Sequence, residues 1–524
     1  MILKQMHRTL AIAAIAALAA CASNGSGSPV PAGPSLGANN GLVQQNFVGI
    51  GDSLTFGEQS GGNLGVVTTA PGISALPNAL VQPTQTNGFF ALMYAQKNNI
   101  TLDPTFGVWN TDTALGQAGS PLPLIAAPGL GAEMVVSTQG AGFAATHSSC
   151  DSINQAAYGS ATWPSTRANA GGPIANLGVP GITMHEAVAM TAPLTGPPSG
   201  ANCGYTAIPG DPTSGNLQSL VAGESGMFYP VLGQFRGLVA QPTQLNDALY
   251  LKPQLTTVWL GANDLLKFIF SHGQSPATDS PAQFQSDLTQ IVTALESHGS
   301  KVVVGNLPDI LGNPSTNEPP VPQFFPQTKL SADLQALGVP AGAAGAVASY
   351  VQTHYTQGAG GFLTESGFFA VVQQVKAGSV TPQLDPNGAG SGDGGAYLDQ
   401  AFAAQAIALN AGYNQIINQI AAGTGSGLAD VQTAFQQLQQ TGVPLPGCTL
   451  TLQFGGGLIS FDGLHPANTG YALVANAFIG AADTKFSMAI PPLTNQQIGQ
   501  IAGNDQYNPC VVKSFNPAWP YPLP

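Results

Sequence analysis

The sequence predicts an α/β fold whose sheet is mostly parallel. Short apolar runs typical of buried strands occupy residues 47–50, 256–260 and 301–304. Between the second and third runs, residues 281–298 repeat apolar side chains every three or four positions, as an amphipathic helix does. Strands that alternate with helices need crossover connections, so the sheet should be parallel and covered by helices on both faces.

The first two expected strands each end in a loop with polar side chains. Phe47-Val48-Gly49-Ile50 runs directly into Gly51-Asp52-Ser53-Leu54, and the strand at 256–260 runs into Gly261-Ala262-Asn263-Asp264. Ligands of doubly wound α/β folds bind beyond the carboxyl ends of the strands. We therefore expect these two loops to lie at the same edge of the sheet, beside a site.

Further elements follow the helix at 281–298. A third strand is expected at 301–304, then a helix near 405–421, then a short strand-like run at 427–431. Long loops without secondary structure are uncommon in compact domains, so the stretches between the elements should be covers of the site or small subdomains. These Gly- and Pro-rich stretches fall at roughly 59–88, 105–172, 196–228 and 313–396.

The composition limits the range of functions. The chain has 524 residues, including 66 Gly and 42 Pro, and only 7% of its residues are charged, so turns and loops should be abundant. Twelve basic residues face 25 acidic ones, which gives a net charge of −13. Because nucleic-acid binding depends on clustered Lys and Arg, we expect no nucleic-acid partner.

The amino-terminal residues have the pattern of an export signal. Basic residues precede an apolar run at 10–20 that is too short to span a bilayer. The run ends in Leu18-Ala19-Ala20-Cys21, which resembles the lipobox of bacterial lipoproteins. We expect residues 1–20 to be a signal peptide, Cys21 to be acylated, and residues 21–45 to be a flexible tether. The acyl chains would anchor the exported protein in the cell envelope, with the outer membrane as the expected place. An ordinary signal peptide is the alternative.

The remaining cysteines favour two disulfides, because they are even in number in an exported chain. Three pairings are possible, and we expect the two that each close a local excursion, Cys150–Cys203 and Cys448–Cys510. Zinc ligation is the alternative. The cysteines lack CxxC spacing, so we expect no metal site.

A serine and a histidine carry the candidate chemistry. A nucleophilic serine needs an exposed hydroxyl, a neighbouring base and donors for the oxyanion formed on attack, and Ser53 at a strand end provides the exposure. His465 lies in Ser460-Phe461-Asp462-Gly463-Leu464-His465-Pro466. A single tight turn can set the Asp462 carboxylate against one imidazole nitrogen while the other faces the serine.

Four sequence blocks resemble, in the same order, those of the SGNH (GDSL) hydrolase family. The resemblance implies a flavodoxin-like three-layer α/β/α fold with long loop insertions. It implies that Ser53 is the nucleophile and that Asp462 and His465 complete the triad. It also implies an oxyanion hole made by the Ser53 and Gly181 backbone N–H groups and the Asn263 side chain. The blocks are residues 47–54, 176–181, 261–264 and 462–466.

The resemblance, taken together with the composition of the unmatched stretches, leads to an expected domain organisation and activity. Residues 46–484 would form the catalytic domain, with a lid at about 313–396, and residues 485–524 a Pro-rich extension. The expected activity is that of an esterase or lipase, a serine-dependent hydrolase of small-molecule or lipid carboxylic esters that needs no cofactor. A polysaccharide O-deacetylase of the same fold and an inactive, surface-anchored binding protein are the alternatives. Retention of all the family's catalytic residues argues against the inactive protein.

Overall fold

The computed structural model describes segments of the chain that all lie within Pro34–Pro524. They are residues 46–59, 68–69, 80–81, 85–100, 102, 174–190, 231–232, 235, 238–273, 279–312, 324–384, 396–453, 455–460, 463–505 and 507–511.

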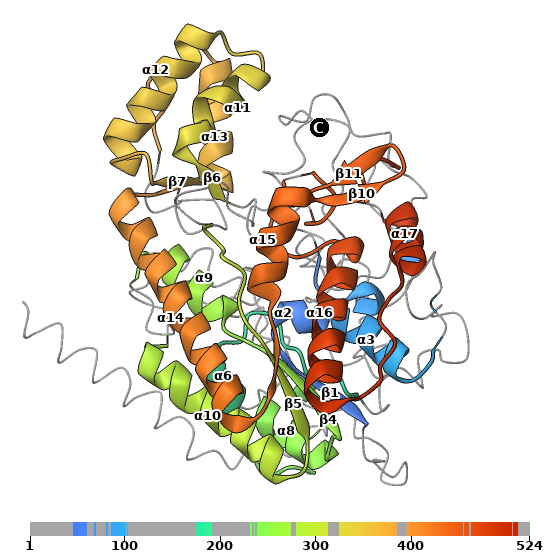
Figure 1. Ribbon diagram of the computed structural model, residues 1–524. Coiled ribbons are helices and arrows are strands. Elements are labelled where there is room, and N and C mark those ends of the chain that lie inside the picture. Colours follow the sequence, from blue (N-terminus) through green and yellow to red (C-terminus); the bar gives the residue numbers. More distant parts are fainter. Residues whose placement is uncertain are drawn as a thin grey trace, which may run out of the picture. The chain divides into compact units, whose positions relative to one another are not determined.

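A parallel sheet lies at the centre of the described residues (Figure 1). Its strands are β1 (Phe47–Gly51), β4 (Leu255–Trp259), β5 (Lys301–Gly305) and β9 (Gly427–Ala429), in the order β1-β4-β5-β9 with every neighbouring pair parallel. A single parallel bridge joins Gly49 to Asn176 on the other edge of β1. The predicted α/β fold with a parallel sheet is confirmed.

The remaining described strands form small antiparallel pairs and a triplet. They are β2 (Thr68–Thr69) with β3 (Leu80–Val81), β10 (Val443–Leu445) with β11 (Cys448–Leu450), and β6 (Phe324–Pro326), β7 (Phe362–Thr364) and β8 (Tyr397–Leu398).

Helices supply most of the rest of the described structure. They are α2 (Ser53–Phe56), α3 (Phe89–Lys97), α6 (Met184–Ala189), α8 (Gln244–Leu251), α9 (Ala262–Phe270), α10 (Pro281–Ser297), α11 (Leu330–Ala336), α12 (Ala341–Val351), α13 (Glu365–Lys376), α14 (Gln400–Thr424), α15 (Val431–Thr441), α16 (Asn468–Phe486) and α17 (Asn495–Asn504).

Helices cover both faces of the parallel sheet. On one face α16 packs on α3 and on strands β5 and β9, and on the other α10 packs on α14 and β5, with α8 against β1 (Figure 1). The sheet is therefore the middle of three layers, as expected for a doubly wound fold. Its carboxyl end remains free to carry the loops of a site.

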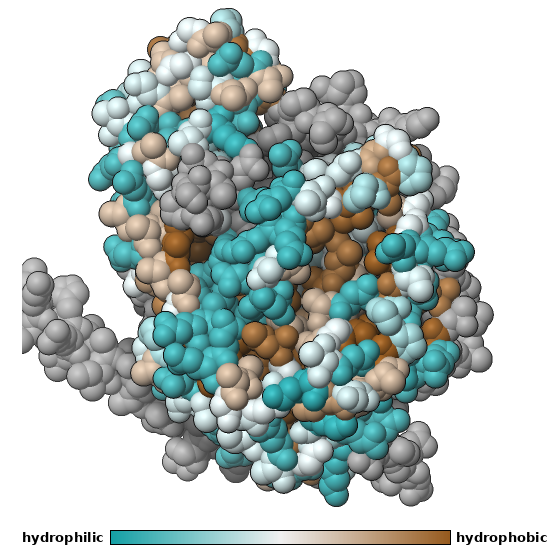
Figure 2. Space-filling model, viewed as in Figure 1, coloured by the Kyte–Doolittle hydropathy of each residue, from teal (hydrophilic) through white to brown (hydrophobic). Residues whose placement is uncertain are grey.

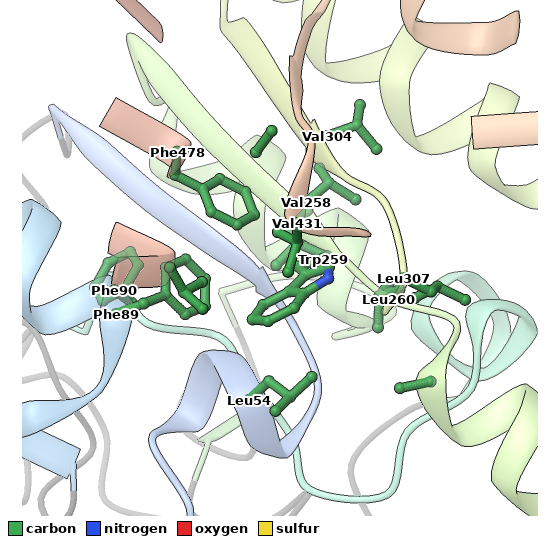
Figure 3. Close-up of a cluster of buried hydrophobic side chains, with 14 of the residues drawn as sticks. Leu54, Phe89, Phe90, Val258, Trp259, Leu260, Val304, Leu307, Val431 and Phe478 are labelled. Carbon is green, nitrogen blue, oxygen red and sulfur yellow. The ribbon is translucent and has the colours of Figure 1, made fainter. Parts of the chain in front are cut away.

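Aromatic side chains fill the core on the α3 and α16 face (Figure 3). Trp259 packs edge-on against Phe89 at 5.3 Å between ring centroids, and Phe89 stacks on Phe478 at 4.8 Å. At Gly305 an added Cβ would lie 2.6 Å from the Phe478 ring and 2.7 Å from Trp259, so only glycine fits between them. Leu54, one residue after the candidate nucleophile, belongs to the same core.

The predicted helices are present, with bounds set by their caps. Helix α10 begins after Ser280, whose Oγ accepts the Gln283 N–H at 3.2 Å. Helix α14 is longer than the predicted 405–421, because Asp399 caps its start and Gly425, in the left-handed conformation, ends it. The predicted run at 427–431 is a strand only to Ala429, because Asp430 caps α15 by accepting the Thr433 N–H.

The described part of the 313–396 insertion is a folded unit with a core of its own. Strands β6, β7 and β8 pack with α11, α12 and α13 around buried side chains that include Leu334, Val347 and Phe368. Phe324 of β6 also stacks on Phe270 of α9 at 6.3 Å. A lid function for this insertion stays a prediction. Within the described segments, no helix combines the length and apolarity needed to cross a bilayer.

Candidate active site

Ser53 stands at the turn between β1 and α2, as the sequence predicts. Asp52 caps α2, and its Oδ1 accepts the Leu54 N–H at 2.9 Å. Gly51 makes the turn possible, because an added Cβ would lie 2.8 Å from the Trp259 carbonyl oxygen and still closer to Thr55. The serine therefore begins a helix at the carboxyl edge of the sheet.

The Asp52 carboxyl is buried beside Ser53. Burial raises its pKa to about 7, against the opposing effects of the Leu54 N–H and of His465. Its Oδ2 has no hydrogen-bond partner within the described segments. Asp52 therefore orders the turn through its Oδ1.

Two buried amide side chains brace this turn. Asn176 Nδ2 donates to the Thr55 carbonyl at 2.7 Å, and its Oδ1 accepts the Gly178 N–H at 2.9 Å. Gln244 Nε2 lies 2.6 Å from the carbonyls of both Gly51 and Leu177. The second sequence block is thus bonded directly to the serine turn.

Asn263 contacts the Gly181 loop through Ile182, the residue that follows Gly181. Asn263 Nδ2, at the start of α9, donates to the Ile182 carbonyl at 3.2 Å. Gly181 has a φ of +80°, which favours glycine. Gly261 caps α9 with a φ of +116°, and an added Cβ there would meet the Phe284 ring at 2.8 Å. The two predicted oxyanion-hole loops are in contact.

His465 reaches Ser53 across most of the chain. Its Nε2 lies 2.8 Å from Ser53 Oγ, although the two residues are 412 positions apart. The His465 loop turns at Gly463, whose N–H donates to the Ser460 carbonyl at 3.0 Å, and the Ser460 N–H donates to the His465 carbonyl at 2.8 Å. Both side chains are buried, with 6% of His465 and 8% of Ser53 exposed.

A pocket opens beside these residues. Ser53, Asn263 and His465 line it together, so the structure gathers three of the predicted site residues in one place. Its other lining residues are apolar: Leu54, Trp259, Ala262, Leu266, Pro308, Ile310, Phe435, Leu464 and Pro466. Gly181 is not among the lining residues, and it contacts the site through the bond from Asn263 to Ile182.

Of the other predicted site residues, two form a disulfide and four lie outside the described segments. Cys448 and Cys510 form a disulfide, as expected. Four further residues lie outside the described segments, so their lipid, disulfide and triad roles stay predictions: Cys21, Cys150, Cys203 and Asp462. In the parts of the chain that the structure describes, no group of three His, Cys, Asp or Glu side chains is placed to hold a metal ion.

Sequence reasoning missed the residues that support the site. Asn176 and Gln244 are neutral side chains with no local signal of their role, and Gln244 lies on α8, an element that was not expected. Asp264 follows Asn263 directly, yet its contact with α6 depends on the folded backbone. The position of Asp264 inside the third sequence block was the only available signal.

Of the comparisons with known proteins, the one with family models identifies the class of protein. The family model described as GDSL-like Lipase/Acylhydrolase matches residues 138–478, a span that contains Gly181, Asn263 and His465 and begins after Ser53. No curated protein matches the chain. Among solved structures, the crystal structure of LAE5, an alpha/beta hydrolase enzyme from the metagenome of Lake Arreo, Spain, matches with a TM-score of 0.31 and 12% identity. That match covers 84% of this chain and 95% of the other, and at such a score it supports no inference. The family model spans more than half of the sequence, and the chain therefore belongs to the GDSL-like lipase/acylhydrolase family of hydrolases.

Proposed function

We propose that this protein hydrolyses carboxylic esters through an acyl-enzyme, with Ser53 as nucleophile and His465 as general base. The distance of 2.8 Å between His465 Nε2 and Ser53 Oγ carries the proposal. A nucleophile and base in hydrogen-bond contact, inside a pocket at the end of a parallel sheet, are the arrangement that serine hydrolysis requires.

The reaction has two halves, acylation and deacylation, and in each half the imidazole takes up one proton and returns it. His465 Nε2 takes the proton of Ser53 Oγ as that oxygen bonds to the ester carbonyl carbon, and the imidazolium returns the proton to the departing alcohol. Water then attacks the acyl-enzyme while His465 takes one of its protons, and the acid leaves as Ser53 regains its hydrogen. Asp462, three residues before His465, is proposed to orient the ring.

The oxyanion of each tetrahedral intermediate needs hydrogen-bond donors. Asn263 Nδ2 uses one hydrogen on the Ile182 carbonyl and has a second to donate to the substrate oxygen. We assign the other donors to the Ser53 and Gly181 backbone N–H groups. Donors fixed in a buried site act more strongly than they would in water, because little solvent reorganises around them.

The lining of the pocket favours an ester with an apolar acyl group. Apart from Ser53, Asn263 and His465, every lining residue is apolar, and Trp259 and Phe435 add aromatic surface. A polysaccharide would need polar partners for its hydroxyl groups, whereas an alkyl chain gains from leaving water. An esterase or lipase thus fits the pocket better than a glycan deacetylase.

Substitution of the two central residues tests the proposal. Ser53→Ala should abolish both the hydrolysis of nitrophenyl esters and covalent labelling by a fluorophosphonate, and His465→Ala should be nearly as severe. Because the two act as a unit, the double variant should be scarcely slower than either single one. Ser300→Ala is a matched control. Ser300, just before β5, is also a buried serine, and its hydroxyl is hydrogen-bonded to that of Thr256. Full-rate turnover by Ser53→Ala would exclude the mechanism.

A scan of acyl chains separates the candidate substrates. Purified protein should hydrolyse nitrophenyl esters with butyryl or longer chains faster than the acetyl ester, because the longer chains bury more apolar surface in the pocket. Acetylated polysaccharide should be a poor substrate. A preference for acetylated glycan over every nitrophenyl ester would favour the deacetylase instead.

A further inference from the structure

Two buried carboxyls hold the start of α6. Asp264 Oδ2 accepts the Met184 N–H at 3.0 Å, and Asp279 Oδ2 accepts the His185 N–H at 2.8 Å. These are the first two backbone amides of α6, which begins three residues after Gly181. The pair therefore fixes the short segment that leads from Gly181 into the helix.

The same segment is also fixed by Asn263, the residue before Asp264. Asn263 bonds the Ile182 carbonyl, and Asp264 bonds the Met184 N–H two residues further on. Two adjacent residues of α9 thus form hydrogen bonds with two neighbouring peptide groups of the segment that follows Gly181. A movement of Asp264 would change how Gly181 and Asn263 face each other.

The Asp264 and Asp279 carboxyls lie so close together that one of them must be protonated. Asp264 is fully buried and Asp279 is 9% exposed, and no donor reaches Asp264 Oδ1 within the described segments. Two adjacent buried carboxylates repel each other, so one of them holds a proton. Burial, followed by the charge of Asp279 and a hydrogen bond to it, raises the pKa of Asp264 well above its usual range.

The ionisable groups on the surrounding helices already have partners. Lys267 of α9 pairs with Glu186 of α6 at 3.2 Å, and it lowers the pKa of Asp264 less than burial and Asp279 raise it. On the other side of α6, His185 Nδ1 lies 3.0 Å from Asp287 of α10. The Tyr413 hydroxyl, on α14, donates to the backbone carbonyl of Asp279 at 2.6 Å and not to its carboxylate.

We propose that Asp264 is a positioning residue of the oxyanion hole: its protonated carboxyl donates to Asp279, and the pair holds Gly181 and Ile182 against Asn263. The inference rests on the proposed ester hydrolysis for its kinetic consequence. The shared proton is a property of the fold, and it can be measured without any substrate.

An asparagine reproduces the protonated state of Asp264. Its amide can donate to Asp279 while its oxygen accepts the Met184 N–H, as a carboxylic acid does. Asp264→Asn should therefore keep kcat within about threefold of the wild type, whereas Asp264→Ala should lower kcat by about 10- to 100-fold with KM little changed. That loss is smaller than the 10²–10³ expected from removing an oxyanion donor, because the donors remain but lose their alignment.

Infrared spectroscopy reports the proton directly. The spectra are compared in an Asp247→Asn parent, because burial raises the pKa of Asp247 to about 9 and would give it a carboxylic-acid band of its own. At pH 8 this parent should show the band of a protonated carboxyl, and adding Asp264→Asn should remove it. The Asp247→Asn parent also serves as the kinetic control, with kcat expected to match the wild type.

The outcomes separate this inference from the proposed function. Absence of ester turnover by the wild type would reject the proposed function, while the infrared band would still decide whether the carboxyls share a proton. A band unchanged by Asp264→Asn would overturn the inference. It would also be overturned if Asp264→Asn were as slow as Asp264→Ala, or if Asp264→Ala failed to fold and Asp264→Asn lost more than tenfold in kcat.

Discussion

The side-chain amide of Asn263 has one hydrogen on Ile182 and one available for the substrate. Replacing it by alanine should lower kcat for a short-chain ester by about 10²–10³, because one oxyanion donor is lost. KM should change little, since the donor acts mainly on the transition state. Steady-state kinetics at matched folded concentration, with fluorophosphonate labelling slowed but not lost, checks this. Unaltered kcat would remove Asn263 from the oxyanion hole.

Asp247 of α8 is a buried carboxyl that makes the stability of the fold depend on pH. It is fully buried, and neither carboxyl oxygen has a hydrogen-bond partner in the described part of the chain. Burial raises its pKa to about 9, so between about pH 4 and pH 9 the folded state keeps a proton that the unfolded chain releases. This group therefore makes the free energy of unfolding fall as the pH rises through that window.

Asp247→Leu should remove that dependence. The variant keeps the branched shape of the side chain without an unsatisfied polar group, so at pH 8 it should be more stable than the wild type by about 1–3 kcal/mol. Denaturant unfolding at pH 5 and pH 8 measures both values. If the two proteins lost the same stability between these pH values, Asp247 would not be the buried acid responsible.

At the level of elements, α15 connects the sheet to the pocket. Asn306, after β5, donates to Asp430 Oδ1 at 2.8 Å and accepts the Gln432 N–H at 2.9 Å. Asp309, in the same loop as Pro308 and Ile310, accepts the side-chain amides of Gln432 and Gln436 at 2.6 and 2.7 Å. These bonds fix the face of α15 that brings Phe435 into the pocket. In Figure 2, apolar surface remains visible between α15, α16 and α17 beside the polar outer side of α15.

Phe435→Ala should change the preferred acyl length. Loss of the ring enlarges the apolar pocket, so kcat/KM should rise for long-chain nitrophenyl esters relative to butyryl, by about tenfold if about two further methylenes become buried. Leu438→Ala, on the same helix but not in the pocket lining, is the matched control and should lower stability without altering the preference. An identical chain-length profile for both variants would mean that the acyl group lies elsewhere.

The sequence signals that succeeded were local. The apolar runs before Ser53 and Asn263 predict β1 and β4, because a buried parallel strand is apolar along its whole length. The bond between His465 and Ser53 could be expected from motif order and resemblance. In contrast, the contacts of Gln244 and Asp279 join elements far apart in the sequence, and a single polar residue in a helix or loop gives no sign of a distant partner. Helix α16 was missed because small residues blur its periodicity, and most of its buried side chains depend on α3 and the sheet.

At the level of the whole molecule, the disulfide Cys448–Cys510 fixes the last described segment. It joins β11 to the residues after α17 and closes a loop with a sequence separation of 62. Nearby, Asp505 Oδ2 accepts the Thr469 N–H at 2.9 Å and its hydroxyl at 2.8 Å, so the residues just after α17 also hold the start of α16, which follows His465. The disulfide therefore stabilises the region that follows His465.

Replacing both cysteines by alanine should lower the free energy of unfolding by about 4 kcal/mol, from the loop entropy regained by the unfolded chain. Thermal and denaturant unfolding of the Cys448→Ala/Cys510→Ala variant measures the loss. Ester turnover below the unfolding transition should persist, since neither cysteine lines the pocket. A variant as stable as the wild type would show that the loop is already closed without the bond.

The 412 positions between Ser53 and His465 also determine when the enzyme can first act. The ribosome makes Ser53 before β4, which is the described partner of β1 in the main sheet and begins at Leu255, and His465 comes later still. Until then Phe47, Val48 and Ile50 have no sheet to join, and pairing over such sequence distances is slow. A chain that still lacks His465 therefore cannot carry out the hydrolysis proposed above. Under the proposed mechanism, the topology thus separates synthesis from hydrolysis in time, because hydrolysis can begin only after His465 has been made and has folded against Ser53.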